Sequence, residues 1–388
     1  MIGSLVRSFL RHQASSNFYP LSRHFHTSDK RGNLPAILFT LIKPLSKIAS
    51  YLLGRGARRA WKKLPETKQR NFLQFAKANR GKFLLTGALS AGGLFYLYES
   101  HIQVCPITGR KKCVILTPDQ ARRIGEANFQ DIINDVQESI VPEIDPVYHQ
   151  IASVANRILS ANRDLRQIYD KACTLTVVDS PVVNAFVLPS GNIFVFTGLL
   201  EACDSMDEVS VVLAHEIAHV VLGHVEEKLT RTSFLQMIML VPMSLLWVLI
   251  PYDGVAFITT WFFDTVTNIM LELPFSRFQE TEADEVGLIM AAKACFDVRE
   301  APAFWAKLAL KDGNTDEDPD ADKALELIST HPANETRQEN LEEKLESAIQ
   351  IRRECGCKSL DPTRDPMKKV EEKRQSIENR KKRYDYNL

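Results

Sequence analysis

Two long stretches of apolar residues stand out along this chain. The first, 83–98 (FLLTGALSAGGLFYLY), carries no charge and follows Arg80 and Lys82. Extended to 81–102, it predicts a transmembrane helix with aromatic residues at one end. The second, 234–271, is interrupted by Pro-Tyr-Asp-Gly at 251–254, and each half is barely long enough to cross a bilayer. It predicts a helical hairpin that dips into the membrane, with a buried helical pair as the alternative.

The rest of the pattern is mostly helical. Apolar and charged residues alternate at helical spacing over 117–161 and 301–311. A capping-box sequence at Ser205 precedes a strongly apolar helix expected over 205–225. Two β-rich runs flank the Pro-Ser-Gly-Asn turn at 189–192, which predicts a hairpin. The fold class is therefore α+β, mainly helical, with a small sheet and an N-terminal transmembrane helix. The charged segment 346–388 is expected to form a surface helix followed by a mobile tail.

Charge is distributed unevenly along a chain that is neutral overall. Residues 1–65 hold twelve Lys or Arg and one acid, so the rest carries the compensating negative charge. The Arg-bearing, Ser-rich, nearly acid-free segment 1–33 is typical of a mitochondrial transit peptide. The following basic segment, 34–80, contains an apolar stretch broken by Lys43, Pro44 and Lys47, which favours an interfacial helix, with a disordered linker as the alternative. The basic runs lack nucleic-acid-binding motifs, so no nucleic-acid partner is expected.

The apolar helix carries a metal-binding motif, HEIAH. His215 and His219 are four residues apart, so both imidazoles lie on one face of the helix and can hold one zinc ion. Glu216 lies beside them, where a carboxylate can accept a proton from an attacking water. The motif predicts a zinc endopeptidase; a buried helix that happens to carry two histidines is the alternative.

A third ligand has to come from elsewhere in the chain. His224 lies nine residues after His215, on the far side of the helix, and is excluded. The segment 276–287 offers Glu280 and Asp284 on one helical face, with small Ala283 between them to allow close approach. One carboxylate can bind zinc while the other orients a ligating imidazole. The remaining acids of this segment, Glu282 and Glu285, are expected to be solvated.

Three motifs in order carry a family resemblance. HEIAH, then SRFQETEAD, then Thr-His-Pro with Arg337 six residues after His331, resemble the membrane zinc metalloendopeptidases that include the CaaX prenyl protease and HtpX. The resemblance covers 107–341 and is strongest to the mitochondrial inner-membrane members, whose activity overlaps that of the m-AAA protease. It implies a zincin-type, gluzincin-like domain over 107–345 that combines the HExxH helix with a glutamate helix.

The resemblance also implies roles for single residues. His215, His219 and Glu280 would bind one Zn²⁺, and Glu216 would be the general base. His331 and Arg337 would face the scissile bond as donors to the oxyanion or the substrate backbone, and Asn184 would be the active-site asparagine of the edge strand. A histidine at a helix end and a surface arginine are the alternatives for the first two. The edge of the hairpin could bind an extended substrate by strand addition.

The family resemblance and the charges around 81–102 indicate the partners and the location of the protein. The expected partners are protein substrates anchored in the inner membrane and the bilayer itself, and a homo-oligomer is left open. The resemblance implies cleavage of the inner membrane's dynamin-like fusion GTPase under stress, and protein quality control. More basic residues precede 81–102 than follow it, which indicates a single-pass protein with the protease domain in the intermembrane space. A metal-stabilised scaffold and an endoplasmic-reticulum protease of the prenyl-protease type are the alternatives.

The cysteines form no recognisable framework. There are seven, and none lies in a Cys-x-x-Cys pair. An odd count argues against a complete set of disulfides. Cys355 and Cys357 are expected to be redox-active or to bridge to Cys105 or Cys113.

Overall fold

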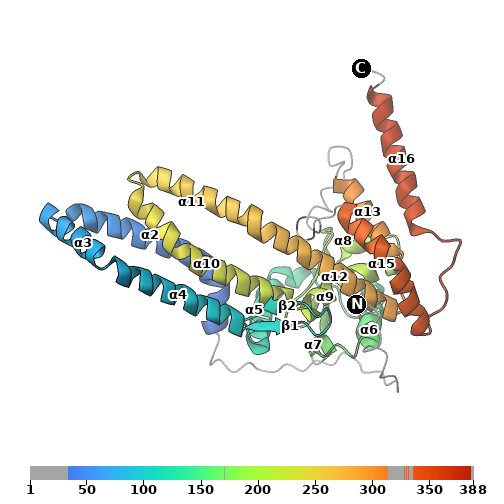
Figure 1. Cartoon of the computed structure of the whole chain (residues 1–388). Coiled ribbons are helices and arrows are strands. Elements are labelled where there is room, and N and C mark those ends of the chain that lie inside the picture. Colours follow the sequence, from blue (N-terminus) through green and yellow to red (C-terminus); the bar gives the residue numbers. More distant parts are fainter. Residues whose placement is uncertain are drawn as a thin grey trace. The chain divides into compact units, whose positions relative to one another are not determined.

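The computed structural model describes residues 34–169, 171–312, 327, 329, 331 and 335–385. The expected transit peptide, 1–33, lies outside these residues. The chain divides into two compact units (Figure 1): unit 1 contains 124–223 and 275–388, and unit 2 contains 27–123 and 224–274. The mainly helical α+β class expected from the sequence is confirmed, because the described strands are few and short.

Unit 1 is built around a three-stranded sheet and the helices that pack on it. Its strands are β3 (Thr174–Val178), β4 (Ala185–Val187) and β5 (Asn192–Phe196), in the order β3-β5-β4. β4 and β5 form the expected antiparallel hairpin, whose turn places Gly191 at φ +97°, a conformation that favours glycine. The sequence did not indicate β3, which pairs with β5 in parallel.

Helices cover this sheet and extend the core. Phe129, Ile132 and Ile133 of α5 pack against a buried cluster that contains Phe194 of β5. Phe194 is fully buried in this cluster, so apolar packing on its side chain joins the sheet to α5. The helices that belong wholly or mainly to unit 1 are α5 (Pro118–Val136), η1 (Gln137–Ser139), α6 (Pro146–Ala161), α7 (Arg166–Tyr169), α8 (Thr197–Ala202), α9 (Met206–Val221), α12 (Leu273–Lys293), α13 (Glu300–Asp312), α15 (Glu335–Glu354) and α16 (Pro366–Asp385).

The C-terminal region differs from the prediction of a single helix and a mobile tail. A second helix, α16, occupies most of the expected tail. Val370 on α16 is buried in a cluster with Ala303 and Ala306 of α13, and Met367 packs against the same cluster. Apolar residues spaced three apart, among many charges, were enough to attach this helix.

A disulfide joins two segments of unit 1 that are distant in sequence. Cys295, which follows α12, bonds to Cys357, which follows α15. The expected bridge to Cys105 or Cys113 is therefore wrong, because both of those cysteines and Cys355 carry free thiols. The pairing depends on how α12 and α15 pack, and spacing along the chain gives no sign of that.

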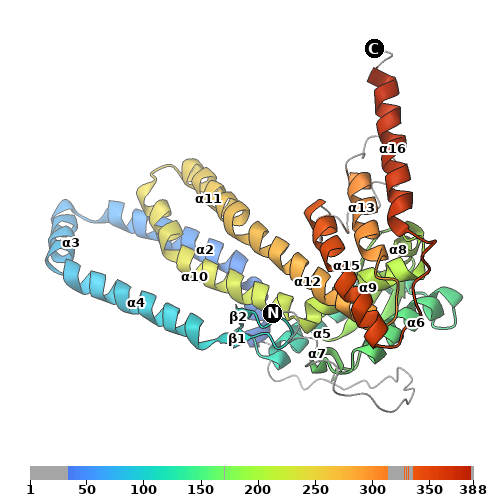
Figure 2. The ribbon, with the colours of Figure 1, turned by 45° about the vertical axis from the view of Figure 1, so that its right-hand side comes forward.

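Unit 2 consists of long helices with a two-stranded sheet. Figures 1 and 2 both show α2 and α10 side by side, and these two helices make the most extensive contact in the structure. The elements are α2 (Leu34–Lys63), α3 (Glu66–Ala78), α4 (Arg80–Ser100), β1 (Ile102–Val104), β2 (Lys111–Cys113), α10 (His224–Leu249), α11 (Asp253–Thr267) and the π-helical turn η2 (Asn268–Glu272).

The apolar stretches are confirmed as helices, although no membrane is present to test whether they span one. α4 covers most of the expected 81–102 and buries none of its residues, but it is not one of the described helices that are long and apolar enough to cross a membrane. The second apolar block forms the expected hairpin of α10 and α11. Two continuous helices, His224–Leu249 and Asp253–Lys293, are long and apolar enough to cross a membrane. The N-terminal stretch, for which we expected an interfacial helix with a disordered linker as the alternative, forms one helix of 30 residues that continues through Pro44.

Candidate metal centre

The helix α9 presents the HEIAH motif from within the core. Its N-cap is Ser205, whose hydroxyl accepts a hydrogen bond from the backbone N–H of Glu208 at 3.2 Å. The Glu208 carboxylate in turn accepts from the backbone N–H of Asp204 at 2.6 Å, which ties the residue before the cap to the first turn of the helix. Nearly every residue of the helix is buried, His215 and Glu216 included. The cap therefore fixes where the helix begins, and the packing of its buried side chains holds it in the core.

His215, His219, Glu280 and His331 lie in one cluster, with one ligand atom of each within 4.8 Å of all the others. The Nε2 atoms of His215 and His219 are 3.0 Å apart. Glu280 on α12 places its carboxylate 3.2 Å from His215 Nε2 and 3.6 Å from His219 Nε2. Two imidazoles and a carboxylate converging on one point are the donor set that zinc prefers in a catalytic site. The residues present therefore fit a zinc ion.

Close packing of two helices brings Glu280 to the histidines. A Cβ atom on Gly287 of α12 would lie 2.9 Å from the backbone nitrogen of His215, so only glycine allows α12 this close to α9. Ala283, one turn earlier, is fully buried, as expected from its small size. The sequence analysis did not single out Gly287, although a glycine inside a helix is a usual sign of close approach.

Replacing Gly287 by alanine tests this contact. Alanine normally stabilises an exposed helical position by up to about 1 kcal/mol relative to glycine. Here we expect the opposite sign, a loss of about 1–3 kcal/mol of unfolding free energy together with weaker zinc binding, because the methyl group forces α12 away from α9. Thermal unfolding and zinc content per chain measure both effects.

Gly92→Ala is the matched control, because a Cβ atom on this α4 residue would meet nothing within 4 Å. If Gly287→Ala were as stable and as zinc-loaded as Gly92→Ala, the close contact between α9 and α12 would not be needed to build the site.

Asp284 and Arg337 form a buried support behind the cluster. Asp284 Oδ1 lies 2.9 Å from His215 Nδ1, on the side of the ring away from the cluster. Arg337 donates two hydrogen bonds to the Asp284 carboxylate, at 2.8 and 2.7 Å, and its guanidinium stacks over the Trp305 ring at 3.5 Å from the centroid. A carboxylate that holds the second nitrogen of an imidazole fixes the tautomer that can bind metal. This arrangement matches the sequence-based alternative in which Asp284 orients a ligating imidazole.

The contacts of Arg337 differ from those of a donor to substrate. Its side chain is only 4% exposed, and besides Asp284 it lies 3.4 Å from Glu280. These contacts favour a positioning role over the expected contact with the scissile bond. The alternative of an arginine in a surface ion pair is excluded by its burial. The family motif pointed to this residue, but nothing in the sequence indicated that Trp305 would lie under it.

His331, a member of the cluster, contacts both Glu280 and the general-base candidate Glu216. Its Nδ1 atom is 2.9 Å from the Glu280 carboxylate, and its Nε2 atom is 3.3 Å from Glu216. It is thus placed to donate to an acceptor beside Glu216. The other two residues of its motif, Thr330 and Pro332, lie outside the described residues.

Asn184, Glu282 and His224 lie outside the four-residue cluster. Asn184 is buried directly before β4, and its carbonyl accepts a hydrogen bond from the Phe196 N–H at 3.1 Å. β4 contacts α9, so the edge strand runs next to the motif helix. Glu282 is buried, contrary to our expectation of a solvated residue, whereas Glu285 is half-exposed and pairs with Lys344 at 3.0 Å. His224 begins α10 and is not one of the cluster residues, as expected.

Burial and neighbouring charges set the protonation of the site. Burial alone would lower the pKa of His215, but its hydrogen bonds to Asp284 and Glu280 raise the pKa to about 9. Burial raises the pKa of Glu216 above its ordinary value, against the opposing charges of His331 and His215. Burial also acts to raise the pKa of Glu280, but hydrogen bonds from His215 and His331 lower it instead. Metal binding must displace the His215 proton, so affinity is expected to fall as the pH falls.

Comparisons with known proteins agree on one family. A model of peptidase family M48 matches residues 149–345. The mitochondrial metalloendopeptidase OMA1 of Bos taurus is 35% identical over 341 residues, which cover 87% of this chain and 64% of the relative. The protein of the same name from Danio rerio is 34% identical over 349 residues, covering 89% of this chain and 72% of the relative. A putative beta-barrel assembly-enhancing protease of Vibrio cholerae is 30% identical over 232 residues, covering 57% and 43%. The chain thus spans about two thirds of the length of the animal relatives.

Proposed function

The chain belongs to peptidase family M48, and on that premise we propose that this metalloendopeptidase is a zinc enzyme of the mitochondrial inner membrane that cleaves membrane-anchored proteins. The observation that carries the proposal is the convergence of His215, His219 and Glu280 beside the buried carboxylate of Glu216. A scaffold that only needed a structural metal would have no use for that extra acid.

In the proposed reaction, His215, His219 and Glu280 hold the metal. Zinc held there would supply a Lewis acid that polarises the scissile carbonyl and makes water acidic enough to attack near neutral pH. Glu216 accepts the proton of the attacking water and passes it to the leaving amine. Burial raises the proton affinity of Glu216, which suits a group that has to accept a proton and then release it.

The surrounding residues have separate roles in this proposal. His331 donates a hydrogen bond to the developing oxyanion from its place beside Glu216. Asp284 and Arg337 keep His215 oriented. Among the described residues, no strand pairs with the outer edge of β4, so an extended substrate could add there through backbone hydrogen bonds, next to Asn184. Backbone recognition of this kind accepts many sequences.

Location and substrates are inferred from the relatives and from the apolar helices. The animal and fungal relatives carry mitochondrial names, which favours the mitochondrion over the endoplasmic reticulum. The hairpin of α10 and α11 follows the motif helix directly in sequence, so the enzyme would act close to the bilayer. We include in the proposal a site in the intermembrane space, the inner-membrane dynamin-like fusion GTPase as a stress-dependent substrate, and a role in protein quality control. Self-association of the chain is part of the same proposal.

Metal removal in a reconstituted membrane tests the proposal. The full chain in liposomes is expected to cleave a reporter joined to a transmembrane anchor, to stop when zinc is chelated, and to recover when one equivalent of zinc is returned. The same reporter without its anchor is the control and should be cut more slowly, because only the anchored form is concentrated at the membrane. Cleavage that survives complete zinc removal would contradict the metal chemistry, and equal rates on both reporters would contradict the choice of substrate.

A further inference from the structure

Helix α2 follows α10 in a fixed parallel register. The Ser46 hydroxyl donates to the Gln236 side chain at 2.6 Å, across a sequence separation of 190 residues. Three turns further along, the Arg58 guanidinium donates to the Ile250 carbonyl across a separation of 192 residues. Because partners advance together along both helices, α2 and α10 run in the same direction and stay in contact over most of their length, as Figures 1 and 2 show.

The contact between α2 and α10 is close. A side chain at Gly54 would clash with the Ser244 carbonyl and with the Trp247 Cβ atom, so the two backbones approach each other there. Trp247 is 5% exposed and meets the Tyr51 ring edge-on, at 4.8 Å between centroids. Small residues where two helices touch are characteristic of helix pairs in lipid.

Ion pairs at two positions join α2 to the hairpin of α10 and α11. Asp264 of α11 pairs with Lys47 at 2.5 Å. At the end of the hairpin, Asp253 pairs with Arg55 at 2.7 Å and also with Arg58. Lys47 and Arg58 are eleven residues apart, and so are Asp253 and Asp264. Eleven residues make about three helical turns. Lys47 and Arg58 therefore lie on one face of α2, Asp253 and Asp264 lie on one face of α11, and the basic residues are spaced to meet the acidic ones.

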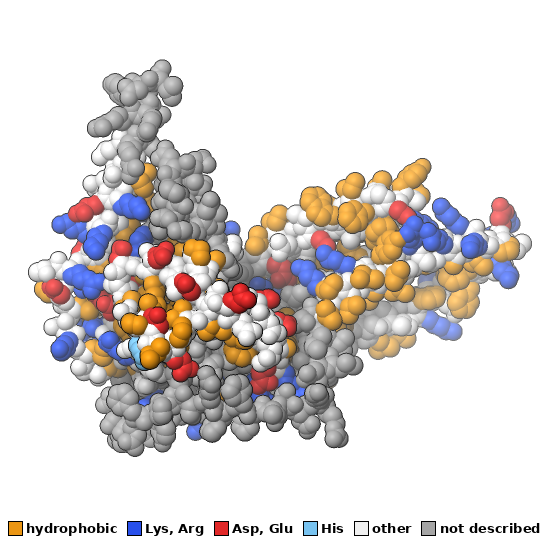
Figure 3. Space-filling model, turned by 180° about the vertical axis from the view of Figure 1, so that it is seen from behind, with side chains coloured by type: hydrophobic (Ala, Val, Ile, Leu, Met, Phe, Trp, Pro, Cys, Tyr) orange, Lys and Arg blue, Asp and Glu red, His pale blue; other side chains and the backbone are white. Residues whose placement is uncertain are grey.

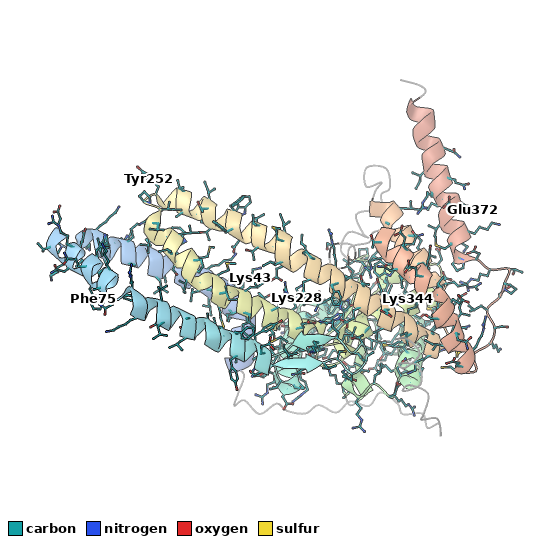
Figure 4. The ribbon with its side chains drawn as sticks, viewed as in Figure 1. Lys43, Phe75, Lys228, Tyr252, Lys344 and Glu372 are labelled. Carbon is teal, nitrogen blue, oxygen red and sulfur yellow. A yellow bond between two sulfur atoms is a disulfide. The ribbon has the colours of Figure 1, made fainter. Side chains whose placement is uncertain are left out.

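The outward surface of these helices is apolar. Large side chains more than half exposed include Leu52 on α2, Leu84 on α4, Val241 on α10, and Phe257 and Trp261 on α11. The space-filling view of Figure 3 shows hydrophobic side chains spread along this unit, with Lys and Arg gathered toward its end. Figure 4 marks that end by Tyr252, in the turn between α10 and α11, and by Phe75 on α3. In water such a surface would be a liability, whereas in a bilayer it is the expected one.

We propose that α2 lies inside the bilayer as the third helix of a unit with α10 and α11, held there by the Lys47–Asp264 pair and the Asp253 cluster, while the outer faces contact lipid acyl chains. The side chains of Lys47 and Asp264 are 45% and 35% exposed on the protein surface. An ion pair this exposed would contribute little in water. Within lipid the pair would stabilise both side chains, because an unpaired charge is energetically costly in the bilayer interior.

The proposal changes the expected membrane topology. With α2 and α10 parallel, the basic ends of α2 and α3 lie at the end of the unit that holds the α10–α11 turn. α4 then returns, since Tyr98 near its C-terminal end packs on Phe234 in the first half of α10. Two helical hairpins would enter the bilayer from the same side instead of one helix crossing it, with the basic turns facing the matrix. The inference rests on the membrane location proposed above but not on the catalytic mechanism.

Crosslinking in liposomes tests the register. The catalytically inactive Glu216→Gln chain would carry Ser46→Cys and Gln236→Cys, so that docking of α2 is read as an internal crosslink without any cleavage. Lys47→Glu and Asp264→Lys are each expected to lower the crosslinking rate by at least about tenfold, because like charges would then face each other in lipid. Combining the two restores opposite charges and is expected to restore the crosslink. Lys43→Glu, on the same helix (Figure 4), is the control, because Lys43 pairs with no acid among the residues that the structure describes, and it should have little effect. Unchanged crosslinking in the single variants, or no recovery in the double variant, would overturn the proposal.

Tryptophan quenching tests the lipid contact without changing any charge. Variants that retain a single tryptophan, Trp261 or Trp247, would be placed in vesicles of brominated phosphatidylcholine. Trp261 is 61% exposed and is expected to be quenched strongly, whereas Trp247 lies under α2 and is expected to be quenched much less. An unquenched Trp261 would place the hairpin outside the bilayer, and equal quenching of both would show that α2 does not cover α10. Because neither readout involves proteolysis, a failure here is distinct from a failure of the proposed enzyme function.

Discussion

Replacing Glu216 by glutamine is expected to lower the cleavage rate by roughly 10²–10⁴-fold while leaving zinc bound. Glutamine has the size of glutamate and cannot accept the proton of the attacking water. Glu216 is buried among His331, His215 and Glu280, and Glu280, the one acid of the metal cluster among the described residues, would be occupied as a ligand to the metal. The measurement is the turnover of the anchored reporter together with zinc content per chain.

Glu285→Gln is the matched control for this variant. Glu285 directly follows the SRFQETEAD motif, but it is half-exposed and pairs with Lys344 away from the cluster. It should retain close to full activity. If Glu216→Gln cut the reporter at the rate of the control while binding zinc normally, the role of Glu216 as general base would have to be abandoned.

Asp284→Asn is expected to weaken zinc binding by roughly 10–100-fold, because the second nitrogen of His215 loses the carboxylate that orients it. The same change leaves the buried Arg337 guanidinium without its main partner, so unfolding free energy should drop by about 3–5 kcal/mol. The pair is fully enclosed and stacked on Trp305, so solvent cannot replace the lost contact. Competition with a fluorescent chelator and denaturant unfolding measure the two effects separately.

A double variant separates orientation from burial of charge. Asp284→Leu combined with Arg337→Met removes both charges and should recover much of the lost stability, since apolar residues can replace a buried ion pair. It should not recover zinc affinity, because His215 would still lack its partner. Full zinc affinity in the double variant would show that Asp284 acts only to neutralise Arg337.

The parts of the site that sequence could predict are those that depend on local spacing. His215 and His219 are brought together by a single helical turn, and the Ser205 cap needs only the next three residues. Glu280 and Asp284 share a face of α12 for the same reason, which is why both acids could be proposed and both lie at the cluster. The choice between them needed the structure: Glu280 faces His219 as well as His215, whereas Asp284 faces the back of the His215 ring.

What the sequence could not predict depends on contacts between distant segments. Gly287 is one helical glycine among several until its Cβ position is compared with the backbone of α9. The Cys295–Cys357 bond and the stacking of Arg337 on Trp305 each join segments whose approach depends on the whole of unit 1. Helix α2 shows the same limit: Lys47 reads as a break in an apolar stretch, and its meaning changes only when Asp264 is found opposite it.

Anomalous diffraction at the zinc absorption edge shows directly which residues hold the metal. We expect one zinc peak per chain, within bonding distance of His215 Nε2, His219 Nε2 and a Glu280 oxygen, with Glu216 close by but not bound. A peak held by another set of residues, or zinc-loaded protein in which Glu280 lies away from the metal, would contradict it.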